Sequence, residues 1–233
     1  MTADATALRR RRDRRSPSAP ELRWFGLEIE RKTNVLSLVA FVLSAAGIAG
    51  QAYFFLQGPR VDLQPPEQVV FYGDRAADGS SVYLKVAAHM AYVNTAQPGF
   101  NDAIKRETAS VQLGQRGLNF FWKKYTASDA DGAIFRLNPK GDALPVAVNA
   151  GSVEAHETSF SPASVSTPKA AYGVNFMPFA EFQKLVETTG QIEVVLAYET
   201  FAGTRGSVSC RVIVDEAMRY YVRNGWVAPP CAR

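Results

Sequence analysis

The chain has 233 residues, of which 47% are hydrophobic and 21% are charged. This composition is typical of one globular domain with appendages, and it excludes a wholly disordered chain or a protein with many membrane spans. The formal net charge of +4 belongs entirely to residues 1–32, which hold nine basic and five acidic residues, whereas residues 33–233 hold 17 of each. Because the larger part is neutral, nucleic acid is not an expected partner.

Residues 1–32 are predicted to be a basic, largely disordered cytoplasmic tail. Six arginines fall within seven positions and Ser16–Pro20 follows them, a composition that cannot form a packed core. The cluster is best explained as a solvated determinant of topology, and the functional alternatives are contact with anionic lipid headgroups and contact with nucleic acid. An organelle transit sequence fits poorly because Asp4 and Asp13 accompany the arginines. The arginines of the cluster are Arg9, Arg10, Arg11, Arg12, Arg14 and Arg15.

Residues 33–58 are predicted to form a single transmembrane helix that acts as a signal-anchor. No charged residue lies between Thr33 and Pro59, and Val35–Leu56 is a run of 22 mainly apolar residues. As a helix this run is about 33 Å long, which matches a hydrocarbon core of about 30 Å. A cleaved signal peptide is the competing interpretation, but the segment before the apolar run is too long for one. A buried helix of a soluble core is a further alternative.

The flanking charges predict the orientation of this helix. Basic residues cluster before it, whereas only Arg60 and Arg75 follow closely. The positive-inside bias therefore places the chain in the cell (inner) membrane, with residues 60–233 in the periplasm or outside the cell. Small residues spaced four apart would let another helix approach closely, unless they only reflect the abundance of small residues in such helices. These residues are Ala40, Ser44, Ala46 and Gly50.

Residues 60–233 are predicted to form one extracytoplasmic, mainly β domain. Short runs of alternating polarity are separated by turn residues throughout this part of the chain. Their number and spacing predict an antiparallel β-sandwich of immunoglobulin-like type, although no tryptophan flanked by paired cysteines marks an antibody-type domain. The predicted strands are Gln68–Tyr72, Ser81–Asn94, Thr108–Leu113, Leu118–Tyr125, Ala133–Leu137, Leu144–Asn149, Val153–Phe160, Ile192–Thr200 and Ser207–Val214.

Two short helices are predicted to pack on the sandwich. Pro178–Glu187 begins with a proline, which is favoured in the first turn, and it carries an apolar face. Asp215–Asn224 has acids in its first turn and is followed by Gly225, which suits the position after a helix end.

Cys210 and Cys231 are the two cysteines of the chain. Both lie in the part assigned to an oxidising compartment, so a disulfide is expected, with two unpaired thiols as the alternative. The bond would close a loop of about 20 residues and stabilise the fold by about 3 kcal/mol. The spacing is too wide for a redox-active CxxC motif.

The sequence shows no motif for catalysis, metal binding or a cofactor. His89 and His156 are its two histidines, and their spacing does not form a metal motif, although they could contribute to a copper site. Asp129 and Asp131 resemble part of a calcium loop that lacks the other ligands, so a tight turn is the better interpretation. Because nucleophile-elbow, phosphate-loop and dinucleotide motifs are also absent, the chain is not expected to be an enzyme.

Two stretches are candidate contacts with a partner protein. Trp122, Lys123 and Lys124 would suit an acidic or aromatic partner, although half of a strand must face the core. Phe100 lies on a Pro-Gly loop, a kind of segment that often carries recognition. We therefore expect a membrane-anchored accessory or scaffold subunit that binds a protein in a membrane complex or a homo-oligomer. The alternatives are a membrane-anchored enzyme or metallochaperone with an unrecognised site, and a polysaccharide or small-ligand binding module.

Overall fold

A computed structural model describes residues 22–24, 27–29, 35–75, 82–131, 134–162 and 176–232. The described chain divides into two units, with the boundary between Leu56 and Gln57. The first unit contains the antiparallel pair β1 (Leu22–Trp24) and β2 (Leu27–Ile29), and helix α1 (Val35–Gln57). The arginine cluster and most of the predicted tail lie outside the described residues.

Helix α1 is long and apolar enough to cross a membrane, and it is the one such helix among the described residues. Its side chains from Ser37 to Phe54 are exposed. The four small residues at which helix packing is predicted lie within this exposed stretch. An apolar helical surface of this kind requires a cover of lipid or of another helix, and the predicted membrane span is one way to supply it.

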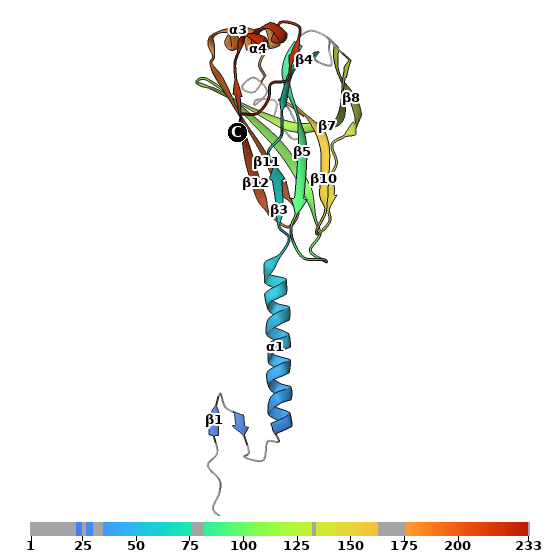
Figure 1. Ribbon diagram of the computed structural model, residues 1–233, viewed down its shortest axis with the longest axis vertical. Helices are drawn as coiled ribbons and strands as arrows, with labels where there is room; N and C mark the ends of the chain where they lie inside the picture. The colour runs from blue at the N-terminus through green and yellow to red at the C-terminus, as the bar shows by residue number, and fades with distance from the viewer. Residues whose placement is uncertain are drawn as a thin grey trace, which may run out of the picture. The chain divides into compact units, whose positions relative to one another are not determined.

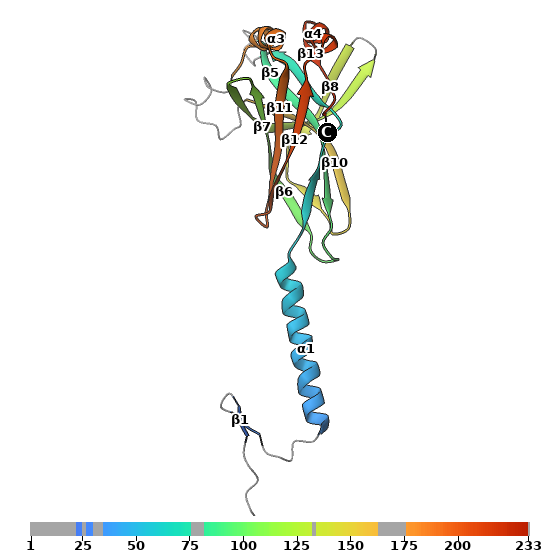
Figure 2. The same ribbon diagram turned by 60° about the vertical axis from the view of Figure 1, so that its left-hand side comes forward.

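The second unit is a mainly β domain built on one curled antiparallel sheet (Figure 1; Figure 2). The sheet has 11 strands in the order β12-β11-β6-β7-β10-β5-β4-β13, with β3 beside β5, β8 beside β7 and β9 beside β6. The strands are β3 (Val61–Gln64), β4 (Val69–Arg75), β5 (Val82–Asn94), β6 (Asp102–Leu113), β7 (Arg116–Asp131), β8 (Ile134–Asp142), β9 (Val146–Val148), β10 (Val153–Ser161), β11 (Gln191–Thr200), β12 (Arg205–Ile213) and β13 (Trp226–Val227).

The prediction of an antiparallel, β-rich domain is confirmed, whereas the immunoglobulin-like pair of sheets is not. Hydrogen bonds connect the described strands into one sheet. Strand β7 shows why. Its first residues pair with β6, and its later residues pair with β10 and β8. One long strand therefore belongs both to the part of the sheet that contains β6 and to the part that contains β10 and β8. These two parts are called here the walls of the curled sheet.

Some predicted boundaries were wrong. Asp129 and Asp131 lie at the end of β7 and pair with Arg136 and Ile134 of β8. A tight turn between these strands would fall on residues 132 and 133, which lie outside the described residues. The predicted strand Ala133–Leu137 stops before Pro139, which lies in β8 opposite a register shift in β7. Among the described strands, β8 pairs with β7 alone. The N–H that a proline lacks therefore breaks no sheet hydrogen bond on the other edge of β8. The strands β3 and β13 are not predicted. They are too short to show the alternation of buried and exposed residues that identifies a strand.

The hydrophobic core lies inside the curl and is built from alternate residues of the strands. On β5 the buried positions include Leu84, Val86 and Met90, in agreement with the predicted period of two. On the neighbouring strands β11 and β12, Tyr198 lies over its cross-strand partner Gly206, where an added Cβ would come within 2.6–2.9 Å of the tyrosine side chain. Because Gly206 has no side chain, the Tyr198 ring can occupy the space above it.

Helices α3 (Phe179–Thr188) and α4 (Glu216–Val222) confirm the two predicted helices and lie together at one end of the domain (Figure 1). The side chain of Gln183 on α3 donates to the carbonyl oxygen of Val222 on α4 at 2.9 Å. The carboxylate of Asp215 accepts from the backbone N–H of Met218 at 2.7 Å and so caps α4. Both helices bury apolar residues in the core of the domain.

The segment after α4 runs from one end of the strand order to the other. Strand β13 pairs with β4, after which the backbone N–H of Cys231 donates to Glu67 at 2.9 Å. The next residue, Ala232, donates to Arg211 on β12 at 2.7 Å. The sulfur atoms of Cys231 and Cys210 lie at bonding distance, as the sequence predicts. This segment therefore connects the β4 side of the curled sheet to β12.

Candidate functional site

Two neighbouring grooves in the domain share the side chain of Trp226. The first, called here the lysine groove, has a volume of about 630 Å³. The second, called the apolar groove, has a volume of about 450 Å³. The lysine groove is lined in part by Tyr72, Lys85, Lys123, Lys124, Thr126 and Trp226. The apolar groove is lined in part by Ile213, Met218, Tyr221, Trp226, Pro229 and Pro230.

A β-bulge in β7 places two lysines on the same side of the sheet. Opposite β10, Lys124 pairs with Ser159 and Trp122 with Phe160, so Lys123 is the extra residue between them. Both lysines are exposed, while Trp122 packs against the core. Without the bulge, strict alternation would send consecutive lysines to opposite faces.

The lysine groove carries an excess of positive charge. Its lining contains three lysines and one acidic residue, Asp74, which forms an ion pair with Lys85. Within the described residues, neither Lys123 nor Lys124 has an ion-pair partner, although Asp142 is the cross-strand neighbour of Lys124. Two ammonium groups are therefore available to an anionic ligand.

Hydroxyl groups line the same groove. The phenol oxygen of Tyr72 and the hydroxyl of Ser159 lie 2.6 Å apart in a hydrogen bond. Thr126 is 6% exposed, and its Oγ1 has no hydrogen-bond partner in the described part of the chain. An unpaired buried hydroxyl costs free energy, so a ligand that reaches Thr126 would gain an available hydrogen bond.

The protonation of Tyr72 gives the first testable prediction. Burial raises the pKa of Tyr72 from 10.0 to about 12; the hydrogen bond with Ser159 opposes this rise, and the charges of Asp74 and Glu157 add to it. Because the folded-state pKa is the higher one, the resulting stability is fully present below pH 10 and is lost as pH rises through about 12. In urea denaturation, wild type should lose stability more steeply over this range than Tyr72→Phe. Parallel pH profiles would contradict the assignment.

The apolar groove groups exposed hydrophobic side chains beside the disulfide. Ile213 is 54% exposed and Tyr221 is 49% exposed. The ring centroids of Tyr221 and Trp226 lie 6.5 Å apart, and Cys231 also lines the groove. Apolar and aromatic side chains that gather in a concave surface are typical of a binding site.

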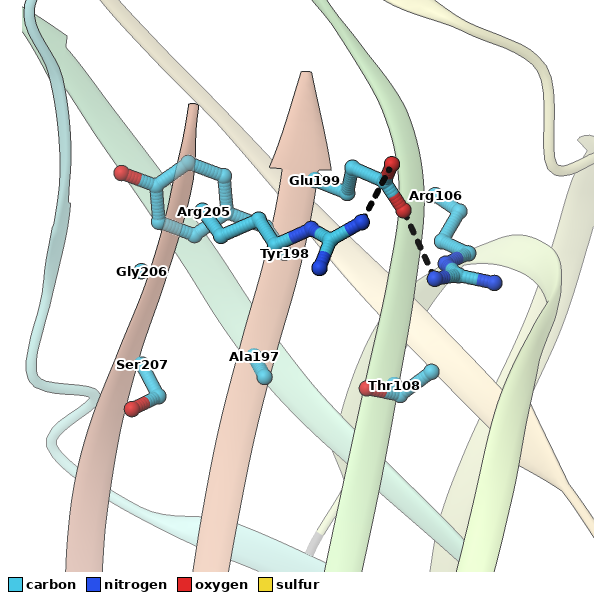
Figure 3. Close-up of a pocket in the computed structure, with 8 residues that line it drawn as sticks. All are labelled: Arg106, Thr108, Ala197, Tyr198, Glu199, Arg205, Gly206 and Ser207. Carbon is cyan, nitrogen blue, oxygen red and sulfur yellow. Dashed lines mark hydrogen bonds and ion pairs between the residues drawn. The ribbon is translucent and has the colours of Figure 1, made fainter. Parts of the chain in front are cut away.

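A third cavity of about 360 Å³ lies over β6, β11 and β12 (Figure 3). Figure 3 shows Glu199 between Arg106 and Arg205. The Glu199 carboxylate lies 2.7 Å from Arg106, 3.3 Å from Arg205 and 3.6 Å from Lys105. Desolvation raises the pKa of Glu199, but the Arg205 hydrogen bond and the three positive charges outweigh it and hold the pKa below its ordinary value. We interpret this network as a link between three strands, because its cations already share an anionic partner.

Glu107 on β6 lies inside the core and accepts hydrogen bonds from two other strands. Its Oε1 accepts from the Tyr92 phenol at 2.8 Å and lies 2.7 Å from Nε2 of His156, while its Oε2 accepts from Thr158 at 2.7 Å. Burial, followed by the Glu107 charge, raises the pKa of Tyr92. Glu107 lines none of the three cavities above, so we interpret the network as a structural link among β5, β6 and β10.

The residues predicted to contact a partner lie in different places. Lys123 and Lys124 line the lysine groove, Trp122 packs against the core, and Phe100 lies on the loop after β5. A contact between any of them and a partner stays a prediction. The described residues contain no group of three or more potential metal ligands.

Most groove residues are missing from the sequence prediction, among them Lys85, Thr126 and Trp226. Lys85 belongs to a strand that the period of two identifies, but the sequence does not say which strands lie beside it. Thr126 follows the predicted strand Leu118–Tyr125, and the bulge that shifts its register has no sequence signature. For Trp226 the signal is an aromatic residue directly after Gly225, the glycine that follows the predicted helix Asp215–Asn224.

No protein-family model matches the chain, and no curated protein matches its sequence. Among solved structures, the chain has a likeness to Spo0M, a sporulation control protein from Bacillus subtilis. The two share 12% sequence identity, and the match covers 68% of this chain and 49% of Spo0M, with a TM-score of 0.27. The chain therefore spans about half the length of Spo0M, and a TM-score of this size supports no conclusion about fold or function.

Proposed function

We propose that the chain is a single-pass, membrane-anchored accessory subunit whose extracytoplasmic β domain binds a partner protein. The observation that carries this proposal is the surface around Trp226, where the apolar groove meets the lysine groove. Protein interfaces commonly combine aromatic anchors and apolar contacts with a polar rim. Exposed Ile213 and Tyr221 would supply the apolar contacts, and the lysines would form part of the rim.

Two further features support this arrangement. Helix α1 has the length and composition of a membrane anchor. The paired cysteines fit a domain in an oxidising compartment, and Cys231 forms part of the apolar groove. The walls of the curled sheet enclose the core much as two sheets of a sandwich would, and we propose no closer relation to immunoglobulin domains.

The partner surface can be tested with an aspartate in the apolar groove. A tagged full-length chain, extracted from its native membrane in detergent, should co-purify with a stoichiometric integral-membrane protein. Ile213→Asp should reduce recovery of this protein at least about ten-fold, because a charge would be buried among apolar side chains. The measurement is the ratio of the partner to the tagged chain by quantitative mass spectrometry.

Val153→Asp provides a matched control. Val153 is 63% exposed, compared with 54% for Ile213, and both are β-branched residues at strand ends. Val153 does not line either groove, so recovery of the partner should stay within about two-fold of wild type. A chain that purifies without a stoichiometric partner, or equal losses in both variants, would refute the proposal.

A further inference from the structure

We infer that the lysine groove binds carboxylate groups of an acidic segment in the partner protein, with the Thr126 hydroxyl as an additional hydrogen-bond donor. This inference rests on the proposed function for the kind of partner, and it adds the chemistry by which that partner is recognised. Two independent features of the groove carry it: the ammonium groups of Lys123 and Lys124, and the buried hydroxyl of Thr126.

The charges in the groove favour an anion. Lys123 and Lys124 are exposed on one side of the sheet, because the bulge in β7 breaks the alternation. Asp74, the one acidic residue in the lining, already pairs with Lys85. Each ammonium group offers three N–H donors and no acceptor, so a carboxylate is a complementary partner.

Thr126 identifies a hydrogen-bond position within the groove. Its side chain is almost completely buried, yet Oγ1 lacks a partner among the residues that the structure describes. Backbone pairing with Glu157 on β10 and Pro139 on β8 holds Thr126 between two strands. A ligand carboxylate could accept a hydrogen bond from this hydroxyl. Binding by attraction to the lysines alone would not depend on the Thr126 hydroxyl.

The neighbouring apolar groove favours an acidic peptide over a free phosphate. Trp226 lines both grooves, so a ligand that fills the lysine groove can continue into the apolar one. There it meets Ile213, Tyr221 and Pro229, whose apolar surfaces can contact apolar side chains of a peptide. A free phosphate has no apolar group to place there.

The test uses the full-length chain in detergent micelles and three labelled probes. These are hexaglutamate, hexalysine and hexagalacturonate, a sugar with the same number of carboxylates as hexaglutamate. Fluorescence anisotropy should show that hexaglutamate binds most tightly, with an affinity that falls as sodium chloride is raised. Tighter binding of hexagalacturonate would overturn the inference in favour of a carbohydrate.

Variants locate the binding in the groove. Lys123→Gln with Lys124→Gln should weaken hexaglutamate binding at least about ten-fold, because both charges are lost. Thr126→Val should weaken it about three-fold or more, whereas Thr126→Ser retains the hydroxyl and should bind like wild type. Equal binding by Thr126→Val and Thr126→Ser would remove Thr126 from the site and overturn the inference as stated.

The control pair is Lys105→Gln with Lys184→Gln. It removes the same charge from exposed lysines that do not line the lysine groove, so hexaglutamate binding should stay within about two-fold of wild type. A loss equal to that of the groove variant would indicate general charge attraction and overturn the inference. If hexaglutamate does not bind but Ile213→Asp still releases the partner, the inference fails and the proposed function stands. Binding of hexaglutamate without a co-purified partner would support the groove's preference for carboxylates but would refute the proposed function.

Discussion

Replacing Glu107 with alanine is expected to lower the free energy of unfolding by about 3–5 kcal/mol, as when one member of a buried charged network is removed. The substitution would leave the hydroxyls of Tyr92 and Thr158 without their acceptor. It would also remove the carboxylate beside Nε2 of His156. A buried donor without a partner costs about 1–3 kcal/mol. Urea denaturation followed by circular dichroism measures the loss.

A graded series separates this network from general effects of truncation. Tyr92→Phe removes one hydrogen bond to Glu107 and should cost about 1 kcal/mol. Glu193→Ala changes an exposed glutamate on β11 and should alter stability by no more than about 0.5 kcal/mol. If Glu107→Ala were as stable as Glu193→Ala, the network would not hold β5, β6 and β10 together.

Loss of the bond between Cys210 and Cys231 is expected to lower the free energy of unfolding by about 3 kcal/mol, because the bond closes a loop with a sequence separation of 21. The double variant Cys210→Ala with Cys231→Ala leaves the rest of the chain unchanged. It should also bind the partner more weakly, since Cys231 forms part of the apolar groove. Guanidinium denaturation of both proteins measures the first effect, and co-purification measures the second.

Reductant provides the control for this comparison. It should destabilise the wild type to the level of the double variant and should not change the double variant itself. Thiol titration of the unfolded, unreduced wild type should detect no free cysteine. Two reactive thiols in that experiment would show that the bond does not form.

Local patterns predict the elements of this fold better than their arrangement. The alternation along Val82–Asn94 identifies β5, and Asp215 marks the beginning of α4. Each of these signals is contained in a short stretch of neighbouring residues. Pairing between distant strands has no such local signal. The position of β11 between β6 and β12, and the sharing of β7 between the two walls, therefore cannot be inferred from strand number and spacing.

The same distinction explains what the sequence says about the site. Lys123 and Lys124 are visible as adjacent charges after aromatic residues, but the groove forms where β4, β5, β7 and β10 meet. Glu107 had a signal that the predicted strand Thr108–Leu113 omitted. The inward alternation of Leu113, Val111 and Ala109 leads directly to it. Charged residues are rare at core positions, so the predicted strand was begun at Thr108, one residue after Glu107.

The segment 226–232 has a consequence for how the domain folds. It begins with β13 and follows all the other strands of the curled sheet in chain order, yet it pairs with β4 and contacts β12. During synthesis, β4 and β12 therefore carry unpaired backbone groups until this segment is in place, and other chains can pair with these groups. Completion of the fold depends on contacts of high sequence separation, which form slowly. The unfinished domain is thus most open to aggregation in the interval before residue 232 docks against Arg211.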